Sequence, residues 1–310
     1  MLSQKKLTSA FNLPIGSQII GKWDRQRYTI TRLLGKGAVG AVYLVKRDDG
    51  HLIALKISDQ IASISSEINV LKKLTKVQGT SPGPSLFDVD DWISPTGENY
   101  PFYTMEYVKG ERLDQFIQRR GMDWISLLFA QLLSELAKLH QAGFVLGDLK
   151  LENLIVTSDP IRLRFIDVGG VTLFGRSVKE YTEFYDRGYW QCGDRKAEPK
   201  YDLFSLAMVA IHCTYPKQFN KTDQPKQQLL AKLRQAKSLN RYQLFLERAL
   251  LGRYKGCLEM KRDLEKHYLS RMSKNQKVIL PSNHDQQTSW LEISIFSIIS
   301  LITWLLAYLN

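Results

Sequence analysis

The sequence predicts an α+β protein with two lobes, a small β-rich lobe and a larger helical lobe, followed by one apolar C-terminal helix. Three observations predict this. β-branched residues alternate with polar ones from Tyr28 onward, a long helical pattern begins after Gly110, and the last eighteen residues carry no charge. We divide the 310-residue chain into a lead (1–27), a small lobe (28–108), a large lobe (109–272), a linker (273–289) and an anchor (290–310).

The small lobe is expected to follow an irregular lead. Its alternating segments predict strands over 28–34, 41–47 and 52–57, and Asp48-Asp49-Gly50 between the last two is a hairpin turn signal. Residues 65–74 carry apolar side chains at the spacing of one helix face. Two further strands are expected over 85–94 and 100–108.

The large lobe begins with a different pattern. Residues 124–143 predict a long helix that ends at Gly143, as glycine favours a helix C-terminus. Two short strands are expected over 153–156 and 163–167, and helices from Tyr201 onward. Residues 273–289 are polar and unpatterned, which is typical of a linker.

The C-terminal segment, 290–310, predicts a single membrane-spanning helix. No charged side chain follows Glu292, and eighteen helical residues would span about 27 Å. A hydrocarbon core of about 30 Å makes one crossing feasible. Basic residues upstream favour a cytoplasmic position for the large N-terminal part by the positive-inside rule, so we expect a single-pass protein of the cell membrane. The alternative is a buried or amphipathic helix.

The net charge of +12 is unevenly distributed. Residues 195–277 hold 19 Lys and Arg against 7 Asp and Glu, and the rest of the chain is neutral. Such an excess attracts phosphate-rich or acidic partners. The densest run, at 226–241, was expected to lie along one helix, with Lys226, Lys237 and Arg241 roughly on one side. DNA or anionic lipid could bind there, or the region could be a solvated surface.

Two features of the small lobe point to phosphate binding. Gly35, Gly37 and Gly40 lie between two predicted strands, where glycine lets the backbone approach phosphate oxygens. Lys56, on the next strand, could reach the phosphates and be held by Glu67 on the following helix. A glycine turn or an exposed lysine alone would be unremarkable, but the pair together favours a nucleotide site.

The large lobe carries the third and most specific pattern. Asp148-Leu149-Lys150 is followed by Asn153, and Asp167-Val168-Gly169 begins fourteen residues later. Asn153 and Asp167 offer the oxygen ligands that Mg²⁺ prefers. Asp148 is then free to accept the hydrogen bond of an attacking hydroxyl, and Lys150 can stabilise charge on a transferred phosphoryl group.

Over residues 28–270 these patterns resemble the protein kinase signature set: the glycine-rich loop, the strand lysine, the catalytic loop and the D-F-G motif. Residues 105–108 resemble the gatekeeper and hinge, and 202–205 the start of the central helix of the large lobe. With its apolar C-terminus, the chain resembles the eukaryotic-like (Hanks-type) Ser/Thr kinases of bacteria.

The resemblance implies a two-lobed kinase fold that binds Mg-ATP and phosphorylates Ser or Thr of proteins. The catalytic residues are Asp148, Lys150, Lys56 and Glu67; the nucleotide would contact Gly35, Gly37, Gly40, Val42, Ala54, Lys56, Glu106, Val108 and Ile155; Asn153 and Asp167 would hold Mg²⁺.

Three departures from the family pattern matter. Leu146 and Gly147 replace the histidine and arginine of H-R-D, so Gly147 cannot grip a phosphorylated loop. Val168 replaces the phenylalanine of D-F-G, and residues 191–193 stand where A-P-E is expected, which puts the stability of that segment in doubt. The candidate sites of loop phosphorylation are Thr172, Ser177 and Thr182.

Two rival functions remain open from the sequence. One is a pseudokinase, the same fold used as a membrane-tethered scaffold. The other is a nucleic-acid-binding module on a kinase fold, with 195–277 as its binding region.

Overall fold

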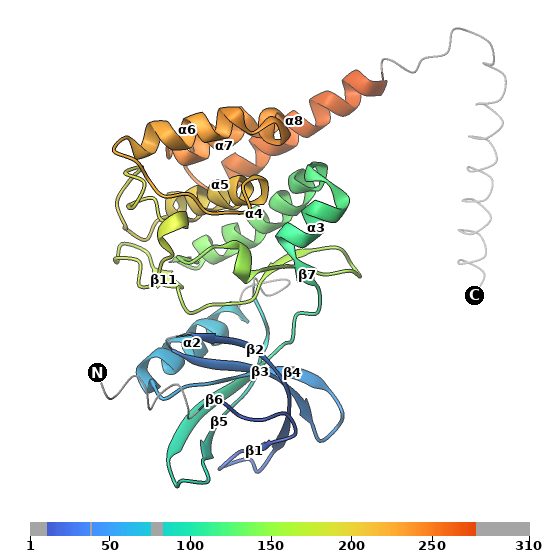
Figure 1. The fold of residues 1–310 in the computed structure, drawn as a ribbon, viewed down its shortest axis with the longest axis vertical. Helices are drawn as coiled ribbons and strands as arrows, with labels where there is room; N and C mark the ends of the chain where they lie inside the picture. The colour runs from blue at the N-terminus through green and yellow to red at the C-terminus, as the bar shows by residue number, and fades with distance from the viewer. Residues whose placement is uncertain (1–10, 38, 76–82, 277–310) are drawn as a thin grey trace, which may run out of the picture. The chain divides into compact units, whose positions relative to one another are not determined.

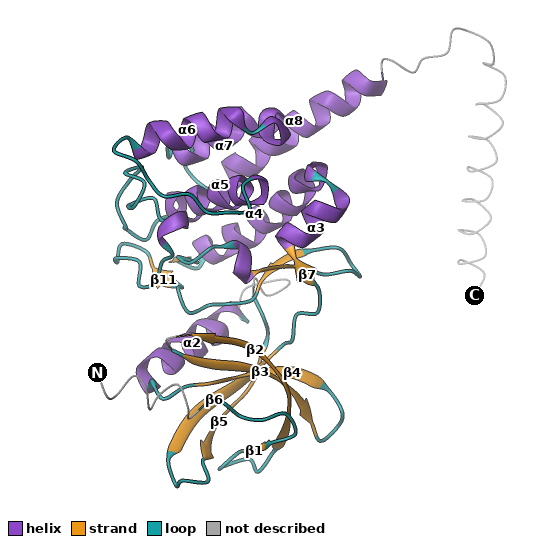
Figure 2. Cartoon of the chain, viewed as in Figure 1, coloured by secondary structure: helices purple, strands orange, loops and turns teal. Residues whose placement is uncertain are grey.

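The computed structural model describes residues 11–37, 39–75 and 83–276 of the chain. By contacts the chain divides into two units, 1–265 and 266–310. The first unit contains both predicted lobes: strands gather in the small lobe and helices in the large lobe (Figures 1 and 2). Of the second unit, the structure describes only the end of the last helix, α8 (Cys257–Gln276).

The small lobe is a six-stranded antiparallel sheet with one helix. Its strands are β1 (Gln18–Ile20), β2 (Arg27–Gly37), β3 (Gly40–Arg47), β4 (Leu52–Ile57), β5 (Leu86–Ile93) and β6 (Asn99–Met105), in the order β1-β2-β3-β4-β6-β5. The helix α2 (Ile61–Leu74) follows β4. The strands and helix predicted over 28–105 are therefore confirmed, although α2 begins four residues earlier than expected.

The lead was wrongly expected to be irregular. Residues 18–20 form β1, which pairs with β2, and Phe11 and Ile19 are buried in the core of the small lobe. The hydroxyl of Tyr43 also donates a hydrogen bond to the backbone oxygen of Phe11. The small lobe therefore begins about seventeen residues before the predicted boundary at 28.

Alternation along β4 separates a core face from a cleft face. Ile53, Leu55 and Ile57 pack into the hydrophobic core of the small lobe, whereas Ala54 belongs to the main cluster that extends into the large lobe. Because side chains two residues apart share a face, Lys56 points to the same side as Ala54. This register is what brings the lysine into the cleft.

The large lobe is mainly helical, as predicted. Its helices are α3 (Leu113–Arg120), α4 (Ile125–Gln141), α5 (Pro199–Thr214), α6 (Pro225–Gln235), α7 (Gln243–Leu250) and α8. Every residue of α5 from Tyr201 to His212 is buried, so this helix forms the centre of the lobe. α3 was not predicted, because only three of its eight residues are buried and its pattern is mostly polar.

Short strands carry the loops that face the cleft. β7 (Glu111–Arg112), β9 (Leu154–Val156) and β10 (Leu163–Phe165) form one antiparallel sheet, and β8 (Phe144–Val145) pairs with β11 (Thr172–Leu173). Gly110 lies against β9, where a side chain would collide with the backbone of Val156. The residues expected to transfer phosphate lie just before and between these strands.

Two predictions, the linker and the anchor, concern the C-terminal part of the chain. The linker was expected to begin at 273, but α8 continues to Gln276. No helix within the described ranges is both long and apolar enough to span a membrane. The predicted anchor, 290–310, lies outside the described residues, as does most of the predicted linker.

Candidate active site

The lysine on β4 and the glutamate on α2 form a buried ion pair. Lys56 Nζ lies 2.6 Å from Glu67 Oε2, and the same oxygen accepts a hydrogen bond of 2.7 Å from the hydroxyl of Tyr103 on β6. Burial lowers the pKa of Lys56, but the carboxylates of Asp167 and Glu67 more than offset this and raise it. The lysine is thus held charged in the cleft, in the arrangement expected from the sequence.

Glu67 is only 2% exposed, yet one of its oxygens has no partner. Within the described residues Oε1 is buried and accepts no hydrogen bond. Burial and the charge of Glu67 together raise the pKa of Tyr103 well above its usual value, so this phenol donates to the carboxylate throughout the physiological range. An orphaned buried carboxylate oxygen is costly, and it marks a place where a further charge or donor is missing.

The catalytic loop gathers Asp148, Lys150 and Thr182. Lys150 Nζ pairs with Asp148 Oδ2 and lies 3.4 Å from Thr182 Oγ1, which donates 3.0 Å to Asp148 Oδ1. Asn153 Nδ2 donates to the backbone oxygen of Asp148 at 3.2 Å. This contact leaves the amide oxygen of Asn153 as the atom that a cation would use.

Thr182 was interpreted as a loop phosphorylation site, and its position argues against that reading. Its hydroxyl is already engaged by the two polar groups of the catalytic loop. Thr172 is fully buried in β11, so it is also a poor acceptor. Of the three candidates only Ser177 is exposed.

The backbone of the catalytic loop is fixed by Asp202 at the start of α5. Its buried carboxylate accepts hydrogen bonds from the N–H groups of Leu146 and Gly147 at 2.8 and 2.9 Å, and contacts His140 Nε2 at 2.8 Å. Gly147 has φ +81°, and a side chain there would collide with the backbone oxygen of Gly170. The glycine that replaces the usual arginine therefore suits the local backbone.

Asp167 faces Lys56 across the cleft. Its Oδ1 lies 3.9 Å from Lys56 Nζ and accepts a hydrogen bond of 3.0 Å from the N–H of Gly169. Val168 and Leu146 are buried in the main hydrophobic cluster, so the two apolar replacements keep a packing role. Lys56, Glu67 and Asp167 thus meet although they lie on three separate elements.

Glu180 joins this group and was not predicted. Its carboxylate is half-buried, and a Cβ on Gly169 would lie 3.3 Å from its Oε2. Burial, followed by the charge of Asp167, raises its pKa. No spacing rule pointed to this residue, because the segment between Asp167 and Thr182 has no repeating pattern.

The three loop glycines differ in what the fold demands of them. Gly40 has φ +146°, and a side chain would collide with the backbone of Ile57. Gly35 and Gly37 have open space around the position of a side chain. The fold therefore requires glycine at 40, whereas at 35 and 37 it leaves room above the cleft.

The segment expected to act as a hinge, 105–108, joins the two lobes. Met105, Val108 and Ala54 are buried, and Val42 and Ile155 are half-buried. Glu106 is tied back by Arg164 of β10, with Nη2 to Oε2 at 3.0 Å, and Arg164 also donates to the oxygen of Gly83. Although burial opposes it, Arg164 lowers the pKa of Glu106.

Ion pairs order the segment that follows the loop. The buried Arg187 pairs with Asp194 at 2.6 Å and with Glu198 at 2.8 Å. Asp186, fully buried, pairs with Arg195 at 2.7 Å and accepts from the hydroxyl of Tyr201. Residues 191–193 lie inside this network, which supplies the anchoring that the altered A-P-E motif put in doubt.

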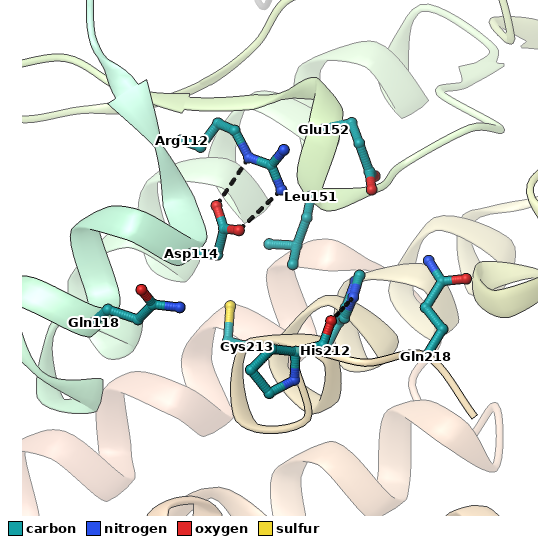
Figure 3. A pocket seen from close by; sticks show the side chains of 9 residues that line it. Arg112, Asp114, Gln118, Leu151, Glu152, His212, Cys213 and Gln218 are labelled. Atoms are coloured by element: carbon teal, nitrogen blue, oxygen red, sulfur yellow. Dashed lines mark hydrogen bonds and ion pairs between the residues drawn. The ribbon is translucent and has the colours of Figure 1, made fainter.

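A pocket of about 310 Å³ lies beside the catalytic loop. Figure 3 shows it between α3, the loop at Leu151–Glu152 and the end of α5. Arg112 and Asp114 pair across one side at 2.9 Å, whereas Glu152 is exposed. The pocket is lined by Arg112, Asp114, Gln118, Leu151, Glu152, His212, Cys213, Pro216 and Gln218.

The basic run at 226–241 is not one helix. α6 ends at Gln235, and residues 237–242 form a separate 3-10 turn, so the expected stripe is wrong. Arg241 pairs with Asp123, Arg234 lies 3.7 Å from Glu247, and Lys232 stacks over Tyr215. Lys226 and Lys237 remain exposed.

The predicted Mg²⁺ ligands can be compared with what the ion requires. In the described part of the chain no three His, Cys, Asp or Glu side chains lie close enough to hold a metal ion alone. Mg²⁺ usually binds to one or two protein carboxylates and completes its shell with phosphates and water. Asn153 and Asp167 offer one amide oxygen and one carboxylate, the types of ligand that such a site uses.

Comparisons with known proteins identify the family. A family model described as the protein kinase domain matches residues 28–291. A serine/threonine-protein kinase of Bacillus subtilis, YabT, is 49% identical over 265 residues, which cover 85% of this chain and 78% of that protein.

More distant relatives share a smaller part. Serine/threonine-protein kinase cek1 of Schizosaccharomyces pombe is 29% identical over 146 residues, 46% of this chain and 11% of that protein. Serine/threonine-protein kinase pim-2 of Danio rerio is 28% identical over 178 residues, 51% of this chain and 56% of that protein.

Proposed function

The chain belongs to the protein kinase family, as a bacterial Hanks-type and ATP-dependent Ser/Thr kinase, and from this premise we propose how its own residues divide the work. Asp148 accepts the hydrogen bond of the Ser or Thr hydroxyl of a protein substrate, and Lys150 stabilises the transferred phosphoryl group. Lys56 holds the nucleotide phosphates. Asn153 and Asp167 hold Mg²⁺, which when bound neutralises phosphate charge.

One observation carries this proposal. Lys56 lies on β4, Glu67 on α2 and Asp167 on the segment after β10. Lys56 Nζ is 2.6 Å from a carboxylate oxygen of Glu67 and 3.9 Å from one of Asp167. The two carboxylates keep Lys56 charged in a largely buried position, where an ammonium group can bind the phosphates of a nucleotide. This arrangement therefore favours an enzyme over the pseudokinase scaffold.

The test is phosphate transfer by the full chain in detergent. We expect Asp148→Asn to abolish incorporation of radiolabelled phosphate into a protein substrate while ATP still binds. Asp48→Asn, an exposed aspartate in the β3–β4 hairpin, is the matched control and should be fully active. A scaffold would bind ATP and show no transfer in either form.

We further propose that the pocket beside Glu152 receives substrate side chains flanking the acceptor. It is next to the catalytic loop, and the exposed Glu152 gives it a net negative lining with a preference for basic residues. Phosphorylation of a peptide array should favour Lys or Arg near the acceptor. Glu152→Gln should weaken that preference, and an unchanged preference would contradict the role of the pocket.

Residues 290–310 are proposed to anchor the kinase in the cell membrane with its catalytic lobes in the cytoplasm. Support comes from the uncharged C-terminal stretch and the basic residues before it. Deletion of 290–310 should move the protein from the carbonate-washed membrane pellet to the soluble fraction. A truncated protein that stays in the pellet would rule out a single anchor.

The excess charge of 195–277 supports a further proposal, that this region binds a polyanion such as DNA or anionic lipid. Because Lys232 and Arg241 have partners, Lys226 and Lys237 are the informative positions. Lys226→Glu with Lys237→Glu should weaken duplex DNA binding and its salt dependence, whereas the control Lys72→Glu on α2 should not. Binding to anionic vesicles but not to DNA would identify lipid.

A further inference from the structure

The activation segment places one additional carboxylate, that of Glu180, in the phosphate end of the cleft. A Cβ built on Gly169 would lie 3.3 Å from Glu180 Oε2, 3.4 Å from Asp167 Oδ1 and 3.7 Å from Glu67 Oε1. Three oxygens from three different elements therefore surround one small space, which stays open because residue 169 has no side chain.

The chain on both sides of Glu180 is fixed, so its position is built into the fold. Lys179 Nζ donates 3.0 Å to Ser66 Oγ on α2, one residue before Glu180. Two residues after it, Thr182 donates to Asp148. The segment cannot move away from the cleft without breaking both contacts.

The charges around this space do not balance. Lys56 is paired with Glu67, and Lys150 is paired with Asp148. Lys56 also lies 3.9 Å from Asp167, so the carboxylates of Glu67, Asp167 and Glu180 share one ammonium group. The deficit is close to the charge of one divalent cation.

A second observation concerns the other carboxylate oxygen of Glu67, the one that does not pair with Lys56. Glu67 is only 2% exposed, and its Oε1 accepts no hydrogen bond within the described residues. This orphaned atom borders the same space as the oxygens of Asp167 and Glu180. Burial of such an oxygen is stabilised only when a cation or a donor completes its surroundings.

We propose that Glu180 is a positioning residue for the divalent cation held by Asp167, acting on it directly or through a bound water. This rests on the proposed Mg-ATP site and deepens it, because it adds a residue from the activation segment to that site. Partners of the atoms that ligate a metal commonly change its affinity by about 10–100-fold. The activation segment thus controls how tightly the kinase holds its metal.

The test measures metal binding by the full chain in detergent, independently of catalysis. Mn²⁺ replaces Mg²⁺, a non-hydrolysable ATP analogue is present, and free Mn²⁺ is counted by electron paramagnetic resonance. Glu180→Gln should raise the dissociation constant for Mn²⁺ by about tenfold. Glu183→Gln, an exposed acid in the same segment, should leave it unchanged.

The outcomes separate this inference from the site on which it rests. If Asp167→Asn weakens Mn²⁺ binding and Glu180→Gln does not, the role of Glu180 is refuted and the metal site stands. If neither change weakens binding, the metal site itself is refuted. Tighter binding of the ATP analogue to Glu180→Gln without metal would show instead that Glu180 only repels phosphate, and would overturn the inference.

Discussion

The buried carboxylate of Glu67 depends on Lys56 as its positive partner. Glu67 is almost fully buried and keeps only the hydroxyl of Tyr103 when Lys56 is removed. We predict that Lys56→Met lowers the free energy of unfolding by about 3 kcal/mol, because an uncompensated buried carboxylate remains. Lys56→Met with Glu67→Gln should regain most of it in urea titrations, while both variants stay inactive. Equal stabilities for the two variants would contradict this account.

Thr182 orients the catalytic loop through its hydroxyl. Thr182→Val should lower kcat about tenfold to a hundredfold, since Asp148 and Lys150 lose the group that fixes them. The KM for ATP should change little, and Thr182→Ser should restore most of kcat. Steady-state kinetics on a protein substrate measure the split, and a rise in KM for ATP alone would refute the assignment.

Among the residues of the site, the sequence predicts those in motifs of fixed spacing and does not predict those outside such motifs. Lys56, Asp148, Asn153 and Asp167 have fixed spacings that the chemistry requires. Glu180 enters the site only because the segment around it folds back across the cleft, which is a tertiary effect without a local signal.

The backbone around Gly147 does not suit the arginine of the H-R-D motif. Gly147 has φ +81° and contacts the backbone of Gly170, so Gly147→Arg should lower Tm and reduce activity. It should not create control by loop phosphorylation. Differential scanning fluorimetry measures the loss of Tm, and a stable Gly147→Arg protein that becomes phosphorylation-dependent would show the opposite.

The turn between β1 and β2 carries a pH-dependent pair of carboxyl groups. Partial burial and contacts with Asp88 and Asp90 raise the pKa of Asp24 from 3.8 to about 7, while hydrogen bonds lower that of Asp90. The folded state therefore binds a proton more tightly than the unfolded chain. Its stabilising effect is complete below about pH 4 and is lost as the pH rises to 7. Asp24→Asn should flatten this slope in urea titrations across that window.

Elements with strong periodicity were predicted, and weakly periodic ones were not. α4 has apolar residues at helical spacing, and β3 and β4 are short runs rich in apolar and β-branched residues, so both patterns are clear. β1 has three residues and α3 is mostly polar, so tertiary contacts decide them. The basic run was misplaced because charge spacing alone does not show where α6 ends.

At the scale of the whole molecule, the small lobe depends on residues before β2. Deleting 1–21 removes Phe11 and Ile19 from its core, and we predict a fall in Tm of about 5 °C or more. Deleting 1–10 keeps Phe11 and β1 and serves as the control. Thermal unfolding followed by circular dichroism distinguishes the two, and an unchanged Tm after the longer deletion would show that this packing is dispensable.

The two-lobed architecture followed from the sequence, but the links between its lobes did not. The sequence places a strand-rich part before a helical part, and the structure agrees. The tie from Arg164 to Glu106 joins residues 58 positions apart. Contacts between residues so far apart in the sequence form only when both lobes are folded, so no local sequence pattern predicts them.

The activation segment is held by Lys179 on Ser66, Thr182 on Asp148 and the pairs of Arg187, and none of these contacts needs a phosphate. We propose that these contacts let the kinase stay active without a phosphate on this segment. A phosphatase would then remove phosphate from the substrates of the kinase and leave the activity of the kinase unchanged. Its output then follows the present supply of nucleotide, metal and partner, and stops when any of them is withdrawn.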